Sequence, residues 1–98
     1  MYGTVAHMKV KPGELEQLQK AFASDQEKAE GEIAVYTYQL DSDPDELIVV
    51  AVFRDKKSYL ANADDPRTDE WYQKVRAHLE SDPEWNDGEI IDTYRRGS

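Results

Sequence analysis

Six apolar-patterned segments follow one another along this chain in the order strand, helix, strand, strand, helix, strand. The third strand segment, residues 47–53, contains no polar side chain, which is typical of a strand buried on both of its faces. One chain of this length has helices enough to cover only one face of the resulting sheet. The other face needs cover from a second chain, so the sequence predicts a dimer.

Turn and capping residues set the limits of these segments. A Pro-Gly pair at residues 12–13 ends the first strand, and a helix begins at Glu14 with acids in its first turn. Asp55 and Asp65 each occupy an N-cap position before a further helical stretch, and Asp65 is followed by proline. We expect strands over residues 2–10, 33–40, 47–53 and 89–94, with a loop over residues 81–88.

Apolar stripes at helical spacing mark the helix surfaces that face the sheet. These stripes are Leu15, Leu18, Ala21 and Phe22 in the first helix, and Trp71, Tyr72, Val75 and Leu79 in the last. Together the elements predict an α+β fold, the ferredoxin-like βαββαβ arrangement, with a four-stranded, mostly antiparallel sheet and helices on one face.

Length and charge restrict the class of protein. The 98 residues suffice for one domain over residues 1–98. A net charge of −9 argues against nucleic acid and anionic lipid as partners, because both are bound through clustered Lys and Arg. No apolar stretch approaches the roughly 20 residues of a membrane span, and the N-terminus passes directly into a strand, so we expect a cytoplasmic protein. The lack of cysteine excludes disulfides, thiolate metal sites and cysteine nucleophiles.

Few residues form a recognisable chemical motif. Asp41, Asp43 and Asp45 alternate as metal ligands do, but the Gly and Glu of a calcium loop do not follow, so a solvated turn is favoured. The two histidines lie on separate elements, which predicts no metal site within one chain. His7 is interpreted as a sheet residue near a dimer contact, with general-base catalysis as the alternative. His78 suits the C-terminal end of the last helix.

Aromatic residues provide the more useful signal. Tyr36 and Tyr38 are two apart on one strand and share a face, while Tyr59, Trp71 and Tyr72 belong to the helices that cover the sheet. If these residues meet between the helices and the sheet, they line a cavity suited to a flat, partly polar organic ligand. The alternative is that they are ordinary core residues.

Three stretches of the chain resemble the antibiotic biosynthesis monooxygenase (ABM) family of dimeric α/β barrels. They are residues 5–13 at the opening strand, residues 50–59 at the junction of the third strand with a helix, and residues 62–66 before the last helix. The resemblance implies the dimeric barrel fold. It leaves the reaction open, since members include cofactor-free oxygenases of aromatic polyketides, quinol oxygenases, haem-degrading enzymes and proteins of no known activity.

Departures from the family patterns narrow the choice. Ala6 lies where the haem-degrading branch has Asn, and Gln73 and Lys74 lie where its axial His belongs, with His78 about one turn displaced. Haem degradation is therefore not expected. Asn62 and Arg67 stand where the quinol-oxygenase branch often has His. The loop over residues 82–85 is longer and more acidic than that branch suggests.

The sequence therefore predicts a cofactor-independent monooxygenase that forms a homodimer and acts on a small aromatic phenol or quinol with dioxygen. His7 or a tyrosine hydroxyl would relay a proton, and Asn62 and Arg67 would hold oxygen anions. The predicted catalytic residues are His7, Asn62, Arg67 and Tyr72; the predicted substrate-binding residues are Tyr36, Tyr38, Tyr59 and Trp71. No cofactor and no metal are expected.

A non-catalytic dimeric module of the same fold, binding small molecules or another protein, is the alternative function. A cavity of roughly 300 Å³ would favour the enzyme, and a filled interior would favour the module. In the predicted dimer two sheets pack face to face, burying Val49, Ala51 and Phe53 or their alternating neighbours. The last strand, near Ile91 and Thr93, would reach the partner.

Overall fold

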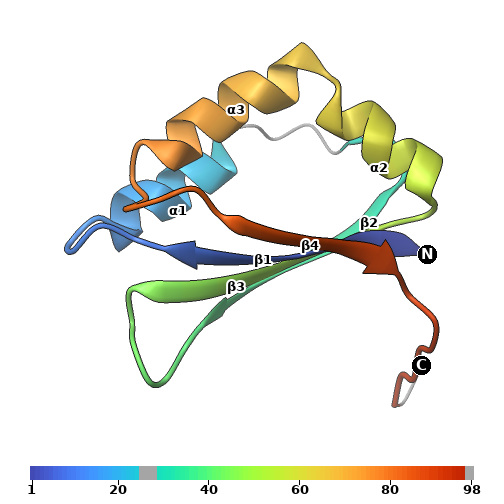
Figure 1. Cartoon of the computed structure of the whole chain (residues 1–98), viewed down its shortest axis with the longest axis horizontal. Helices are drawn as coiled ribbons and strands as arrows, with labels where there is room; N and C mark the ends of the chain where they lie inside the picture. Colours follow the sequence, from blue (N-terminus) through green and yellow to red (C-terminus); the bar gives the residue numbers. More distant parts are fainter. Residues whose placement is uncertain (25–28, 97–98) are drawn as a thin grey trace.

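The computed structural model describes residues 1–24 and 29–96. Four strands form one antiparallel sheet in the order β2-β3-β1-β4, and three helices lie on one side of it (Figure 1). This arrangement confirms the predicted ferredoxin-like α+β fold. The elements are β1 (Tyr2–Lys9), α1 (Leu15–Ala23), β2 (Glu32–Gln39), β3 (Glu46–Phe53), α2 (Lys56–Ala63), α3 (Pro66–Arg76) and β4 (Glu84–Glu89).

Aspartate caps begin the two helices that follow β3, as the sequence predicts. Asp55 Oδ1 accepts a hydrogen bond from the Ser58 backbone N–H at 2.8 Å, and Asp65 Oδ1 accepts one from the Arg67 N–H at 2.9 Å. Each cap satisfies a donor that the first helical turn leaves unpaired. Hydrogen bonds to these caps hold the pKa values of both carboxyls below their usual range. Two short helices, α2 and α3, therefore meet at a corner above the sheet (Figure 1).

The register of the sheet determines which side chains face the helices. Thr4 of β1 lies opposite Ala51 of β3 and Asp87 of β4, and Ala6 lies opposite Val49 and Trp85. Because side chains alternate along a strand, these two rows point to the same side. Thr4 and Ala6 are 6% and 0% exposed under the helices. We call this side of the sheet the helix-facing side, and the other the open face.

The core lies at one end of the helix-facing side. Met8, Val10 and Leu47 of the sheet end pack with Leu18 of α1 and Val75 of α3, and all five are buried. A hydrogen bond of 2.9 Å between His78 Nδ1 and Glu14 Oε1 joins the end of α3 to the start of α1. All members of the two predicted stripes except Tyr72 therefore belong to this core or pack against it.

The last strand is displaced from the prediction. The sequence suggested a strand over 89–94 after a loop over 81–88, but β4 is Glu84–Glu89 and the expected loop contributes most of it. All six β4 residues are exposed at the sheet edge, so no apolar pattern marks the strand. The residues after β4 leave the body of the domain (Figure 1), and Ile91 is 93% exposed.

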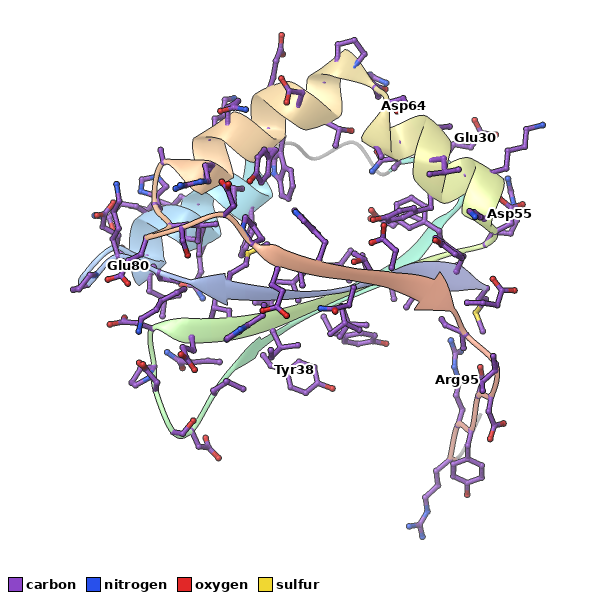
Figure 2. All side chains as sticks on the ribbon, viewed as in Figure 1. Glu30, Tyr38, Asp55, Asp64, Glu80 and Arg95 are labelled. Atoms are coloured by element: carbon purple, nitrogen blue, oxygen red, sulfur yellow. The ribbon has the colours of Figure 1, made fainter. Side chains whose placement is uncertain are left out.

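The open face has no helix over it in the described part of the chain (Figure 1). Tyr36 pairs with Val50, and Tyr38 pairs with Ile48, so these side chains share the open face. Each tyrosine is 58% exposed, and Val5 beside Val50 is 43% exposed. Figure 2 shows Tyr38 on the side of the sheet away from the helices. An apolar surface of this kind is typical of a protein contact.

Candidate functional site

Four of the predicted site residues belong to the two helices that cover the sheet after β3. Tyr59 and Asn62 are one turn apart on α2, and Trp71 and Tyr72 belong to α3; all four are half-buried. The Trp71 ring stacks on Phe22 at 6.0 Å between centroids and 29° between planes. Trp71 Nε1 also donates to the Phe22 carbonyl oxygen at 3.4 Å. These contacts fix the indole between α1 and α3.

The side-chain amide of Asn62 is held by a neighbour on the next helix. Thr68 Oγ1 donates to Asn62 Oδ1 at 3.0 Å. This bond sets the orientation of the amide, because its oxygen is the acceptor. Among the described residues the Asn62 NH₂ group has no hydrogen-bond partner, so two donors remain for a ligand.

A second polar group includes residues that sequence reasoning missed. The Tyr59 hydroxyl donates to Asp87 Oδ1 at 2.9 Å. Burial, reinforced by the Asp87 carboxylate, raises the pKa of Tyr59 to about 12. The buried Thr4 hydroxyl has no hydrogen bond of ordinary geometry to any described residue, although its proximity pulls the Tyr59 pKa slightly the other way. Asp87 could be found only through the pairing of β1 with β4, which the misplaced last strand concealed.

Trp85 also differs from its predicted position. We expected it in an acidic loop, but it lies on β4 in the row of Ala6 and faces the helices. Its ring centroid is 6.1 Å from that of Tyr72. Because β4 is an edge strand, Trp85 remains 48% exposed. Burial is also the main cause that raises the pKa of Tyr72. Both tryptophans of the chain therefore line the same side of the sheet.

The other predicted site residues lie elsewhere. Tyr36 and Tyr38 were expected between sheet and helices, but the pairing of β2 with β3 turns them to the open face. His7 is on that face too, with its Nε2 atom 3.8 Å from Glu46 Oε2. Arg67 forms an exposed ion pair with Asp65 at 3.0 Å at the start of α3. The sheet thus separates Tyr36 and Tyr38 from the helix residues with which they were expected to line a cavity.

A hollow of about 220 Å³ lies next to the stacked rings of Phe22 and Trp71. Phe22, which stacks on Trp71, forms part of its wall. The remaining lining residues are Leu15, Gln19, Thr37, Gln39 and Leu47. This volume is below the roughly 300 Å³ of a typical ligand cavity, and the hollow lies between α1 and β2 rather than under α2.

Two kinds of site are absent from the part of the chain that the structure describes. Residues 1–24 and 29–96 contain no group of three or more His, Asp or Glu side chains placed to hold a metal ion. In the same residues no helix combines the length and the apolar character needed to cross a bilayer.

Known proteins resemble this chain in sequence and in fold. The family model of the antibiotic biosynthesis monooxygenases matches residues 1–74. A conserved protein from Methanosarcina mazei Go1 has a similar structure, with a TM-score of 0.79, 22% identity and coverage of 89% of each chain. A putative antibiotic biosynthesis monooxygenase from Nitrosomonas europaea has a TM-score of 0.78 at 16% identity, covering 94% of this chain and 100% of that one.

A further similar structure comes from a described oxygenase. It is the N63A mutant of SnoaB, a cofactor-independent oxygenase from Streptomyces nogalater, with a TM-score of 0.80 at 15% identity and coverage of 94% of each chain. At these identities the structural likeness shows the shared fold alone. No curated protein sequence matches this chain.

Proposed function

Because the chain belongs to the antibiotic biosynthesis monooxygenase family, we propose that it is a cofactor-independent monooxygenase of small aromatic phenols or quinols. Its site lies on the helix-facing side, between the inner surfaces of α2 and α3 and the sheet. The site residues that this proposal retains from the sequence are Tyr59, Asn62, Trp71 and Tyr72. Asp87 and Trp85 of β4 join them.

The observation that carries the proposal is the fixed amide of Asn62. Thr68 Oγ1 donates to its oxygen at 3.0 Å and leaves the NH₂ donors of this half-buried residue available to a ligand. A fixed donor in a partly dry environment stabilises negative charge more than a mobile one, because it needs no reorganisation when the charge develops. This is the arrangement that a phenolate intermediate requires.

The reaction would need only dioxygen as oxidant. The substrate hydroxyl loses its proton, and the phenolate transfers one electron to dioxygen, giving an aryloxyl radical and superoxide. The two radicals form a carbon–oxygen bond, and the peroxide anion takes back the proton that the substrate lost. The hydroperoxide then loses water, with the hydrogen of the same ring carbon, to leave a carbonyl group on the ring. Asn62 would donate to the phenolate oxygen, while Trp71 and Tyr72 would hold the ring.

The proposed dimer accounts for the residues on the open face. Val50, with Tyr36 and Val5 on either side of it, forms the centre of an exposed apolar surface. Packing two such faces would bury on the order of 2,000 Å², the size of a stable homodimer contact. His7 and Tyr38 would then contribute to the dimer contact rather than to the site. Ile91, which is almost fully exposed, would reach the partner.

Oxygen uptake tests the proposed function. Metal-free protein is incubated with a panel of naphthols and hydroquinones, and uptake above the rate without protein is expected for at least one of them. Asn62→Ala should lower kcat by about 100-fold or more, as for the loss of an oxyanion donor. Gln17→Ala, which removes an exposed amide on α1, should leave the rate unchanged.

Binding measurements with the same compounds distinguish the monooxygenase from the alternative function, a non-catalytic module. Binding of the same compounds with no uptake by any of them would favour a non-catalytic binding module. An Asn62→Ala protein that is as active as the wild type would contradict the role given to this amide.

A further inference from the structure

The polar group formed by Thr4, Tyr59 and Asp87 is not explained by the fold alone. Thr4 and Asp87 are cross-strand partners on the helix-facing side, and Tyr59 reaches them from α2. The Tyr59 ring is held by Tyr2 at 5.3 Å and by Phe53 at 5.4 Å between centroids. Its hydroxyl therefore has a fixed position above β4.

The fixed hydroxyl orients the Asp87 carboxylate. Burial and the Asp87 charge raise the pKa of Tyr59 to about 12, so at neutral pH Tyr59 keeps its proton and acts as a donor. Asp87 Oδ1 accepts a hydrogen bond from this hydroxyl, with 2.9 Å between the two oxygens. The second oxygen has no hydrogen bond to any described residue, and Asp87 is exposed. Asp87 thus presents an oriented acceptor that a ligand can reach.

An unsatisfied group lies directly beside this acceptor. The Thr4 side chain is 94% buried, and its hydroxyl lacks a hydrogen-bond partner among the described residues. Buried polar groups are nearly always paired in native structures, and an exception calls for an explanation. A ligand oxygen bound at Asp87 would give the Thr4 hydroxyl an acceptor, with Tyr59 kept in place.

The neighbouring row of side chains on the sheet indicates that such a ligand has an aromatic ring. Trp85 lies two residues before Asp87 on the same face of β4, about 7 Å along the strand. Tyr72 of α3 lies beside Trp85, with 6.1 Å between the two ring centroids. A hydroxyl at Asp87 would therefore place an attached aromatic ring against Trp85 and Tyr72.

We infer that Asp87, oriented by Tyr59, is the hydroxyl-accepting group of the site and selects aromatic ligands with a free hydroxyl over their methyl ethers. The inference rests on the proposed function, since it assigns the substrate end of the same site. A carboxylate accepts a hydrogen bond from a phenol, whereas an ether has no hydrogen to donate and leaves the carboxylate unpaired. Asp87 would also receive the proton when the phenolate forms: the substrate O–H bond breaks and a carboxyl O–H bond forms.

Anaerobic equilibrium dialysis with 1-naphthol and 1-methoxynaphthalene tests the selection without turnover. The wild type should bind 1-naphthol at least about 10-fold more tightly than the ether, as expected for a hydrogen bond to a charged group. Asp87→Asn keeps an acceptor for Tyr59 but removes the charge, and the preference should fall to about twofold or less. Asp41→Asn makes the same charge change in the exposed β2–β3 turn and should keep the wild-type preference.

Tyr59→Phe provides a second variant. It leaves the carboxylate in place but removes the donor that orients it, so the preference should fall by about threefold or more. A folded Asp87→Asn protein that keeps the wild-type preference would overturn the inference, and so would a wild type that binds neither compound or binds both equally. Oxygen uptake without an Asp87-dependent preference would refute only this inference. A preference without uptake by any phenol would refute only the monooxygenase.

Discussion

Replacing Thr4 by valine should stabilise the protein. The side chain is 6% exposed in β1, and its hydroxyl has no hydrogen bond to the described residues. Valine has the same shape and the same branched Cβ, so packing and strand preference change little. An unsatisfied buried hydroxyl costs about 1–3 kcal/mol, and its removal should therefore raise the free energy of unfolding by about 1–2 kcal/mol. For a domain of this size, each 1 kcal/mol corresponds to about 4–8 °C in Tm.

Urea unfolding at one fixed protomer concentration measures this difference, because the stability of the proposed dimer would depend on concentration. Thr37→Val is the matched control: Thr37 points to the same side of the sheet from β2 but is exposed, so the change should stay within about 0.5 kcal/mol. A loss of about 1 kcal/mol or more in Thr4→Val would show that the hydroxyl is already paired. That result would also remove one support for the hydroxyl-binding role of Asp87.

Three further predictions test other parts of the structure. Val50→Asp places a charge at the centre of the open face and should give a folded monomer by light scattering; a dimer of unchanged mass would exclude this face as the contact. Tyr59 has its pKa raised from 10.0 to about 12, so its stabilising contribution is complete below pH 10 and is lost as pH rises towards 12. Wild-type stability should thus fall more than that of Tyr59→Phe between pH 10 and 12, and parallel curves would contradict the assignment. Trp71→Ala and Trp85→Ala should both weaken 1-naphthol binding, because both rings lie on the helix-facing side and a hydroxyl at Asp87 places the ligand ring against Trp85; unchanged binding by a stable Trp85→Ala protein would contradict this position of the ligand.

Periodicity predicted most of the fold because the buried elements are strongly patterned. The stripe of α3 follows the helical period, the unbroken apolar run of β3 is typical of a strand, and aspartate caps mark the starts of α2 and α3. β4 escaped detection because an exposed edge strand is held by main-chain pairing with β1 and needs no apolar residues. The apolar pair at residues 90–91 drew the prediction beyond the true end of the strand.

The sequence assigned candidate site residues to the correct side of the sheet only where those residues belong to helices. Spacing along α2 and α3 places Tyr59, Asn62 and Trp71 on inner helix surfaces without reference to any other element. The strand residues depend on register, which the alternation of β2 does not settle, because both of its faces carry apolar side chains. Tyr36 was therefore assigned to the wrong side of the sheet, and the pairing of Tyr59 with Asp87 across 28 positions had no local signal.

The source of the oxygen atom in the product tests the central claim most directly. Metal-free protein is supplied with the best phenol of the panel under ¹⁸O₂, and the product is analysed by mass spectrometry. A monooxygenase that uses dioxygen directly predicts one ¹⁸O atom on the product ring, with loss of this product in Asn62→Ala. Product without label, or no product from any phenol that the protein binds, would contradict the account.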